Sequence, residues 1–111
     1  WNDTASLRQL LDEMRADNAI IAASSEGGLF EYGSDEAIVA NLDVLRSDVV
    51  CCVAGSVTRS AEQRRDVTGA DRFKVIPRGL EAFGRLAGHA GFVFAESRPV
   101  IFSDQVLLQP A

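Results

Sequence analysis

Few side chains in this sequence could carry out covalent or acid–base chemistry. His89 is the single histidine, and its neighbours Gly88 and Ala90 are typical of a turn that enters a strand. An imidazole titrates near neutral pH and could transfer protons, but no serine follows the nucleophile-elbow pattern of a hydrolase. We therefore interpret His89 as structural or solvent-exposed and predict no catalytic residue.

The two cysteines, Cys51 and Cys52, are adjacent in the chain. Neighbouring residues form a strained disulfide, and successive side chains of a helix or strand point to different sides, so one tetrahedral metal ion could not bind both. We expect two small buried thiols in a reducing compartment, with the cytoplasm as the default, and we predict no metal site.

The glycines match neither the P-loop spacing nor the dinucleotide-binding fingerprint. The nearest approach is Ala54-Gly55-Ser56 followed by Val57-Thr58-Arg59. If a strand ended at Ala54, the backbone amides beyond it would face an anion at the start of a helix. This alternative ligand site would contain Ser24, Ser25, Ser56, Thr58 and Arg59.

A group of arginines follows that segment, comprising Arg59, Arg64, Arg65 and Arg72. It could be a docking patch for an acidic partner. It could equally be a solvated helix face that neighbouring carboxylates neutralise, and the usual behaviour of surface charges favours this second interpretation.

The bulk composition is that of one globular domain spanning residues 1–111. A net charge of -5 argues against a general nucleic-acid binder. No apolar run approaches the length of a membrane span. We therefore expect neither nucleic acid nor a membrane among the partners.

The first third of the chain shows clear local signals. Apolar residues at helical spacing predict a helix around Leu7–Met14. Ala19–Ser24 is typical of a buried strand, Glu26–Gly28 of a tight turn, and Leu29–Gly33 of a returning strand, which together predict a hairpin. Ser34 and the two acidic residues after it predict the start of another helix.

The central segment has two interpretations. An apolar repeat favours one long helix from about residue 38 to 65. Its centre, Val49–Val57, is rich in β-branched residues and could instead be a buried strand between two helices. The repeat consists of Ile38, Leu42, Leu45, Val49, Cys52 or Val53, Ser56 or Val57, and Ala61.

The last third predicts mainly strands. Phe73–Pro77 and Ala90–Ala95 have strand composition, and Val100–Phe102 and Val106–Leu108 could add more. Leu80–Leu86 is ambiguous, because its apolar spacing suits a short helix whereas its glycines weaken one.

Two stretches carry a resemblance to a known family, Ala19–Gly33 and Val53–Glu62. They resemble the glycine-turn hairpin and the long central helix of the roadblock / dynein light-chain family, in particular the bacterial regulators of Ras-like gliding-motility GTPases. Pro77 and the strand-like residues after Val100 depart from the family's pattern.

The resemblance implies an α+β fold, with a mostly antiparallel central sheet and helices packed on it, as in roadblock and profilin-like proteins. It further implies a non-enzymatic homodimer without cofactors that binds a small GTPase or serves as a scaffold subunit. The residues expected at the dimer interface or core seam are Leu42, Leu45, Val49, Cys52, Gly55 and Ser56. The alternative is a small flavodoxin-like α/β doubly wound sheet that binds a nucleotide or another anionic molecule at its strand ends.

Overall fold

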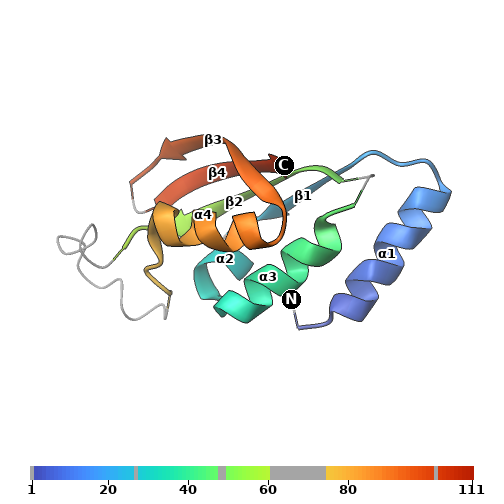
Figure 1. The fold of residues 1–111 in the computed structure, drawn as a ribbon, viewed down its shortest axis with the longest axis horizontal. Coiled ribbons are helices and arrows are strands. Elements are labelled where there is room, and N and C mark those ends of the chain that lie inside the picture. Colours follow the sequence, from blue (N-terminus) through green and yellow to red (C-terminus); the bar gives the residue numbers. More distant parts are fainter. Residues whose placement is uncertain (1, 27, 48–49, 61–74, 102) are drawn as a thin grey trace.

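A computed structural model describes residues 2–26, 28–47, 50–60, 75–101 and 103–111 of the chain (Figure 1). The elements in chain order are α1 (Thr4–Ala16), β1 (Ile21–Ser25), α2 (Leu29–Tyr32), α3 (Asp35–Leu45), β2 (Val50–Thr58), α4 (Gly79–His89), β3 (Phe92–Pro99) and β4 (Ser103–Pro110).

Both helices that the sequence predicts most clearly begin at a capping side chain. The amide of Ser6 donates to Asp3 Oδ1 at 2.9 Å at the start of α1. The amide of Ala37 donates to Ser34 Oγ at 3.1 Å at the start of α3. Each bond satisfies an amide that has no partner within its helix. The predicted helix around Leu7–Met14 and the predicted helix start at Ser34 are confirmed.

The four strands form one mixed sheet in the order β1-β2-β4-β3. β1 and β2 are parallel, whereas β2 with β4 and β3 with β4 are antiparallel. The α+β class is confirmed in this coarse form. The mostly antiparallel roadblock-like sheet is wrong, because the first two strands run in the same direction and are joined through helices.

The long central helix is wrong as well. α3 ends at Leu45, and Val50–Thr58 is a strand that pairs with β1 on one side and with β4 on the other. Two strand partners outweigh the helical spacing of the apolar residues. Gly55 fits this strand closely, since a Cβ there would collide with the ring of Phe30.

The predicted hairpin is also absent, because Leu29–Tyr32 is the short helix α2 and not a returning strand. The amide of Tyr32 donates to the Gly28 carbonyl at 3.0 Å. Neighbouring Leu29 and Phe30 are both buried, whereas a strand would turn one of them away from the core. β1 therefore has β2 as its partner, and not the segment that follows it.

The last third agrees better with its predictions. Residues 73–74 lie outside the described residues, and 75–78 form no strand. The ambiguous Leu80–Leu86 lies within α4, and Ala90–Ala95 overlaps the start of β3. β3 and β4 form a terminal antiparallel hairpin. The strand predicted at Val100–Phe102 is wrong, because Val100 and Ile101 belong to the turn between β3 and β4, and residue 102 lies outside the described residues.

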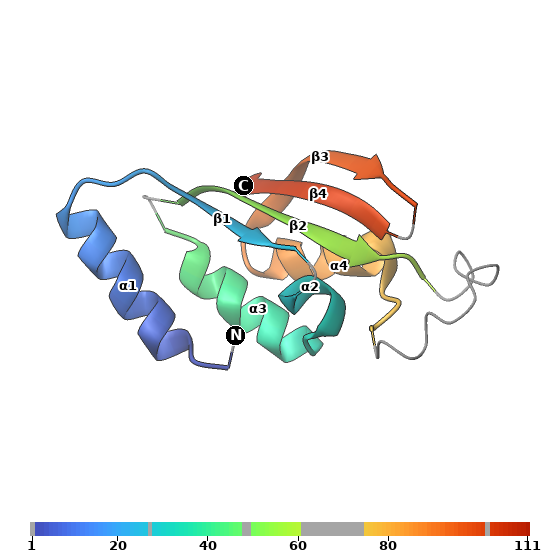
Figure 2. The ribbon, with the colours of Figure 1, turned by 180° about the vertical axis from the view of Figure 1, so that it is seen from behind.

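The described helices lie on one side of the sheet, with α1 beside α3 (Figures 1 and 2). The core between the sheet and the helices contains three fully buried phenylalanines, Phe30, Phe83 and Phe92. The other side of the sheet has no helix over it among the described residues. Within these residues, no helix combines the length and apolarity that crossing a membrane would need.

Candidate ligand site at the carboxyl end of β1

The parallel strands β1 and β2 end at the same edge of the sheet, at Ser25 and Thr58. In open α/β sheets ligands bind in the crevice outside the carboxyl ends of such strands. This edge of the sheet is therefore a candidate ligand-binding site.

A hollow of about 370 Å³ opens there on the helix-covered side of the sheet. Drug-sized ligands occupy cavities that begin at about 300 Å³. The residues that line it come from α1, β1, α2, α3, β2 and the connection between β1 and α2: Leu7, Ala23, Ser24, Ser25, Glu26, Gly28, Leu29, Phe30, Asn41, Leu45 and Val53.

The polar groups of this hollow are two hydroxyls, one amide and one carboxylate. Asn41 is only 6% exposed, and its Nδ2 donates to the Ala37 carbonyl at 2.8 Å. Ser25 Oγ accepts from the amide of Phe30 at 3.4 Å. The lining includes no lysine or arginine among the described residues. The hollow is therefore an apolar cavity with hydrogen-bonding groups and no cation.

A buried arginine holds the turn between α2 and α3, the two helices that contribute Leu29, Phe30, Asn41 and Leu45 to this hollow. The side chain of Arg78 is 4% exposed. It donates to Asp35 Oδ1 at 2.9 Å, to the Phe30 carbonyl at 3.0 Å and to the Gly33 carbonyl at 2.9 Å. Three acceptors on one guanidinium fix the position of the α2–α3 turn.

The end of β2 and the segment before Arg78 hold α2 through Glu31. Thr58 Oγ1 donates to Glu31 Oε1 at 2.9 Å, and the amide of Ile76 donates to the Glu31 carbonyl at 2.7 Å. Neither Arg78 nor Glu31 was among the residues singled out from the sequence. No local pattern marks them, because their partners are 27 to 48 positions away.

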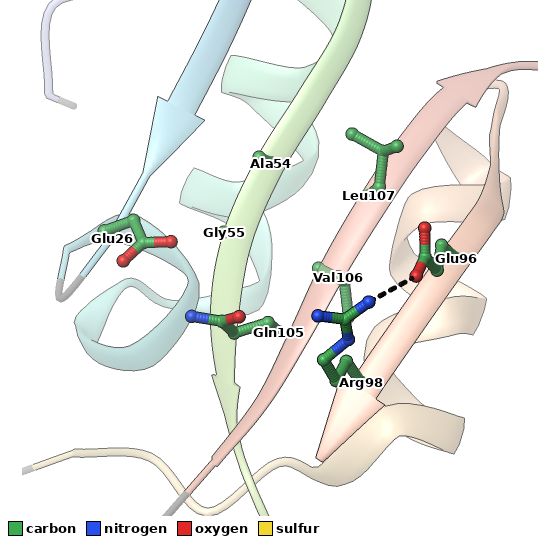
Figure 3. A pocket seen from close by; sticks show the side chains of 8 residues that line it. All are labelled: Glu26, Ala54, Gly55, Glu96, Arg98, Gln105, Val106 and Leu107. Carbon is green, nitrogen blue, oxygen red and sulfur yellow. Dashed lines mark hydrogen bonds and ion pairs between the residues drawn. The ribbon is translucent and has the colours of Figure 1, made fainter. Parts of the chain in front are cut away.

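A second, smaller hollow of about 230 Å³ lies on the helix-free side of the sheet (Figure 3). Arg98 Nη2 lies 3.3 Å from Glu96 Oε1 at its rim, and both side chains are exposed. Glu26 lines both hollows, and Figure 3 shows its carboxylate pointing toward β2 at the second one. The lining residues are Glu26, Ala54, Gly55, Glu96, Arg98, Gln105, Val106 and Leu107.

The residues of the alternative anion site are only partly together. Ser24 and Ser25 line the larger hollow, whereas Ser56 and Thr58 are buried within β2, which extends past Ala54. The strand continues because Gly55–Thr58 pairs with β4. The expected glycine turn into a helix is therefore wrong.

Arg59 is engaged elsewhere. Its Nη2 donates to the carbonyls of Val100 and Ser103, and its Nε lies 3.8 Å from Asp104 Oδ2. The guanidinium thus holds the turn between β3 and β4. Its predicted companions in the docking patch, Arg64 and Arg65, lie outside the described residues.

The residues of the expected dimer interface do not share a helix face. Leu42 and Leu45 are in α3, whereas Cys52, Gly55 and Ser56 are in β2. Val49 lies outside the described residues. Leu42 is fully buried in the core of this chain. The premise of one continuous helical seam is therefore wrong, and the homodimer itself stays a prediction.

The thiols are less buried than the sequence predicts. Cys51 is exposed and Cys52 half-buried, and their sulfurs are 3.8 Å apart. Burial within the sheet raises the pKa of the Cys52 thiol, and neighbouring Cys51 raises it further. The expectation that adjacent thiols point apart is wrong here.

The chain matches no family model. No curated protein matches its sequence either. Its fold, however, is similar to solved structures. TnmH is 17% identical with a TM-score of 0.63, and the match covers 81% of this chain and 30% of TnmH.

The O-methyltransferase NcsB1 from neocarzinostatin biosynthesis is similar in two complexes. The complex with S-adenosylmethionine (SAM) and 2-hydroxy-5-methyl naphthoic acid is 18% identical with a TM-score of 0.58, covering 81% of this chain and 28% of that one. The complex with S-adenosyl-L-homocysteine and 1,4-dihydroxy-2-naphthoic acid is 18% identical with a TM-score of 0.60. This match covers 97% of this chain and 39% of that one.

These similarities concern the fold, and the chain spans about three to four tenths of the length of each structure. They overturn the roadblock resemblance, because the fold is similar to that of these structures, and its parallel β1–β2 pair differs from the hairpin and long helix that the resemblance implies. The predicted function as a non-enzymatic, GTPase-regulating module depended on that resemblance and is therefore wrong as well.

Proposed function

We propose that this chain takes part in the O-methylation of a small hydroxylated aromatic molecule and binds that molecule in the hollow at the carboxyl end of β1. The similarity in fold to an O-methyltransferase, over 81% to 97% of this chain, carries the proposal. The position of the hollow supports it, since α/β folds bind ligands at this edge.

The chemistry of the hollow suits an uncharged aromatic ring that bears hydroxyl groups. Leu29 and Phe30 offer apolar contact, and Asn41 offers an amide in a buried position. The Glu26 carboxylate can accept a hydrogen bond from a phenolic hydroxyl. With no lysine or arginine among the described lining residues, a carboxylate on the ligand would remain unpaired near Glu26. This charge pattern disfavours the nucleotide or anion of the earlier alternative.

The described residues do not form a complete site for SAM. The donor carries ribose hydroxyls, an amino-acid moiety and an adenine, and glycine-rich turns with a following acidic residue commonly hold such nucleosides. The sequence lacks that glycine fingerprint, and Glu26 is the single carboxylate that lines the larger hollow among the described residues. We therefore assign the residues of the hollow to binding the aromatic molecule that accepts the methyl group. We assign none of them to binding SAM, the methyl donor.

The test is equilibrium binding followed by fluorescence, with a dihydroxynaphthalene as the uncharged probe and 1,4-dihydroxy-2-naphthoic acid as its carboxylated counterpart. We expect saturable binding of both, with the uncharged probe bound more tightly. No saturable binding, or tighter binding of the acid, would contradict the proposal.

Two variants of α3 provide a matched comparison. Asn41→Leu removes the buried amide at nearly constant size and should weaken binding of the uncharged probe about tenfold, as expected for one lost hydrogen bond. Asp43→Leu makes the same kind of change on the exposed side of α3 and should leave binding unchanged. Equal effects would place the ligand elsewhere.

A further inference from the structure

An irregularity near the start of β2 places the two thiols on the same side of the sheet. Ile21 pairs with Val50 and Ala22 with Cys52, so Cys51 has no partner on β1. This is a β-bulge, in which two residues oppose one on the neighbouring strand.

The burial pattern shows the consequence of the bulge. Val50 and Val53 are three positions apart, yet both are buried in the core at 2% and 1% exposure. A regular strand alternates faces at every residue, which would put these two valines on opposite sides. Because the bulge adds one residue between them, Val50 and Val53 can both face the core. Both cysteines then face away from it.

The resulting sulfur spacing suits a bound ion better than a disulfide. The sulfurs are 3.8 Å apart. A tetrahedral ion with Zn–S bonds of about 2.3 Å holds two sulfurs about 3.8 Å apart. A disulfide instead prefers Cα atoms at least about 4.4 Å apart, whereas adjacent Cα atoms are about 3.8 Å apart.

We propose that Cys51 and Cys52 form a two-thiolate site for a soft divalent cation of the Zn²⁺ class. Each thiol gives its proton to the buffer and each sulfur donates an electron pair to the ion, so no oxidation state changes. No cluster of three or more histidine, cysteine, aspartate or glutamate side chains able to hold a metal occurs among the described residues. Water fills the remaining positions, and the site is open.

The exposure of the pair makes it reachable in the folded chain, since Cys51 is exposed and Cys52 is half-buried. Thiolate ligands select ions of this class over Mg²⁺ and Ca²⁺. The raised pKa of Cys52 means that the ion must displace a proton there. Neither cysteine lines the acceptor hollow, although Val53, which lines it, follows Cys52 directly.

Titration of the reduced chain with Cd²⁺ alone, followed by the near-ultraviolet thiolate-to-cadmium absorption band, tests the proposal. We expect one Cd²⁺ per chain, two protons released per ion into a weakly buffered solution, and loss of the band when Zn²⁺ competes. Absence of the band, or one ion per two chains, would overturn the two-thiolate site.

Variants separate the pair from a single reactive thiol. Cys51→Ser and Cys52→Ser should each abolish the band while circular dichroism shows an unchanged fold. The double variant Cys51→Ser with Ala54→Cys keeps two thiols on one face but separates their Cα atoms by about 6.6 Å along the strand. It should bind Cd²⁺ at least about tenfold more weakly, as its chelate geometry is lost. A band that persists in either single variant, or equal affinity in the double variant, would refute the role of the bulge.

Discussion

The two faces of the four-stranded sheet carry different side chains, and β4 shows the contrast within one strand. Val106 and Leu108 face the helices and are 4% and 0% exposed. Gln105 and Gln109 alternate with them and are exposed, and Leu107 between them is half-buried. Alternation of this kind is typical of a sheet with one covered face. It indicates that folding of this chain depends on the helix-covered face.

Replacing one leucine on each face gives the largest expected effect. Leu108→Ala should lower the free energy of unfolding by about 2–5 kcal/mol, because a fully buried leucine leaves a cavity. Leu107→Ala, one position earlier on the other face, should cost less than about 1 kcal/mol, because little apolar surface is lost. Urea denaturation of the two variants measures both values, and similar losses would contradict the one-sided core.

Removal of the buried Arg78 guanidinium is expected to give the next largest loss in the free energy of unfolding. Arg78→Ala leaves the carbonyls of Phe30 and Gly33 without their donor and should lower the free energy of unfolding by about 2–3 kcal/mol. Arg85→Ala removes an exposed ion pair with Glu81 and should change it by less than about 1 kcal/mol. If chemical denaturation gives equal values, Arg78 does not hold the α2–α3 turn.

Two glycines should respond to alanine with opposite signs. Gly55→Ala forces the Phe30 ring to move and should destabilise the fold by about 1–3 kcal/mol. Gly88→Ala, in α4 with open space around it, should stabilise the fold by up to about 1 kcal/mol, since alanine favours a helix. Thermal unfolding that shows the same sign for both would argue against close contact between α2 and β2.

The smallest effect concerns the start of α1. The amide of Ser6 and its hydroxyl hold the pKa of Asp3 below the usual 3.8. Because the folded-state pKa is lowered, the stabilisation exists above the ordinary carboxyl range and disappears as the pH falls through the folded-state pKa. Amide protection at Ser6 should therefore fall at acidic pH in the native chain and be independent of pH in Asp3→Asn, as followed by NMR hydrogen exchange.

Local signals allowed only part of the fold to be predicted. The helix around Leu7–Met14 follows from its apolar spacing, and the start of α3 follows from Ser34, because a cap acts on amides three residues away. The fate of Val50–Thr58 depends on β1 and β4, which contribute partners from distant parts of the chain. A repeat that satisfies a helix and a strand equally cannot decide between them.

The candidate site was predicted to a similar extent. Ser24 and Ser25 do lie at a strand end beside a hollow, since strand ends follow from apolar runs. Asn41 and Arg78 have no local pattern that distinguishes them from surface residues. The bulge at Cys51 depends on the register with β1, which a single segment does not encode. Contacts between segments that are distant in the chain therefore determine the features that local sequence patterns do not predict.

NMR mapping of the dihydroxynaphthalene on the isotope-labelled chain tests the central claim most directly, because it locates the ligand on the fold. The proposed function predicts shift changes at the backbone amides of Ser25 and Glu26 and at the side-chain amide of Asn41, with the β3–β4 turn unaffected. Changes confined to that turn, or none at saturating probe, would contradict it.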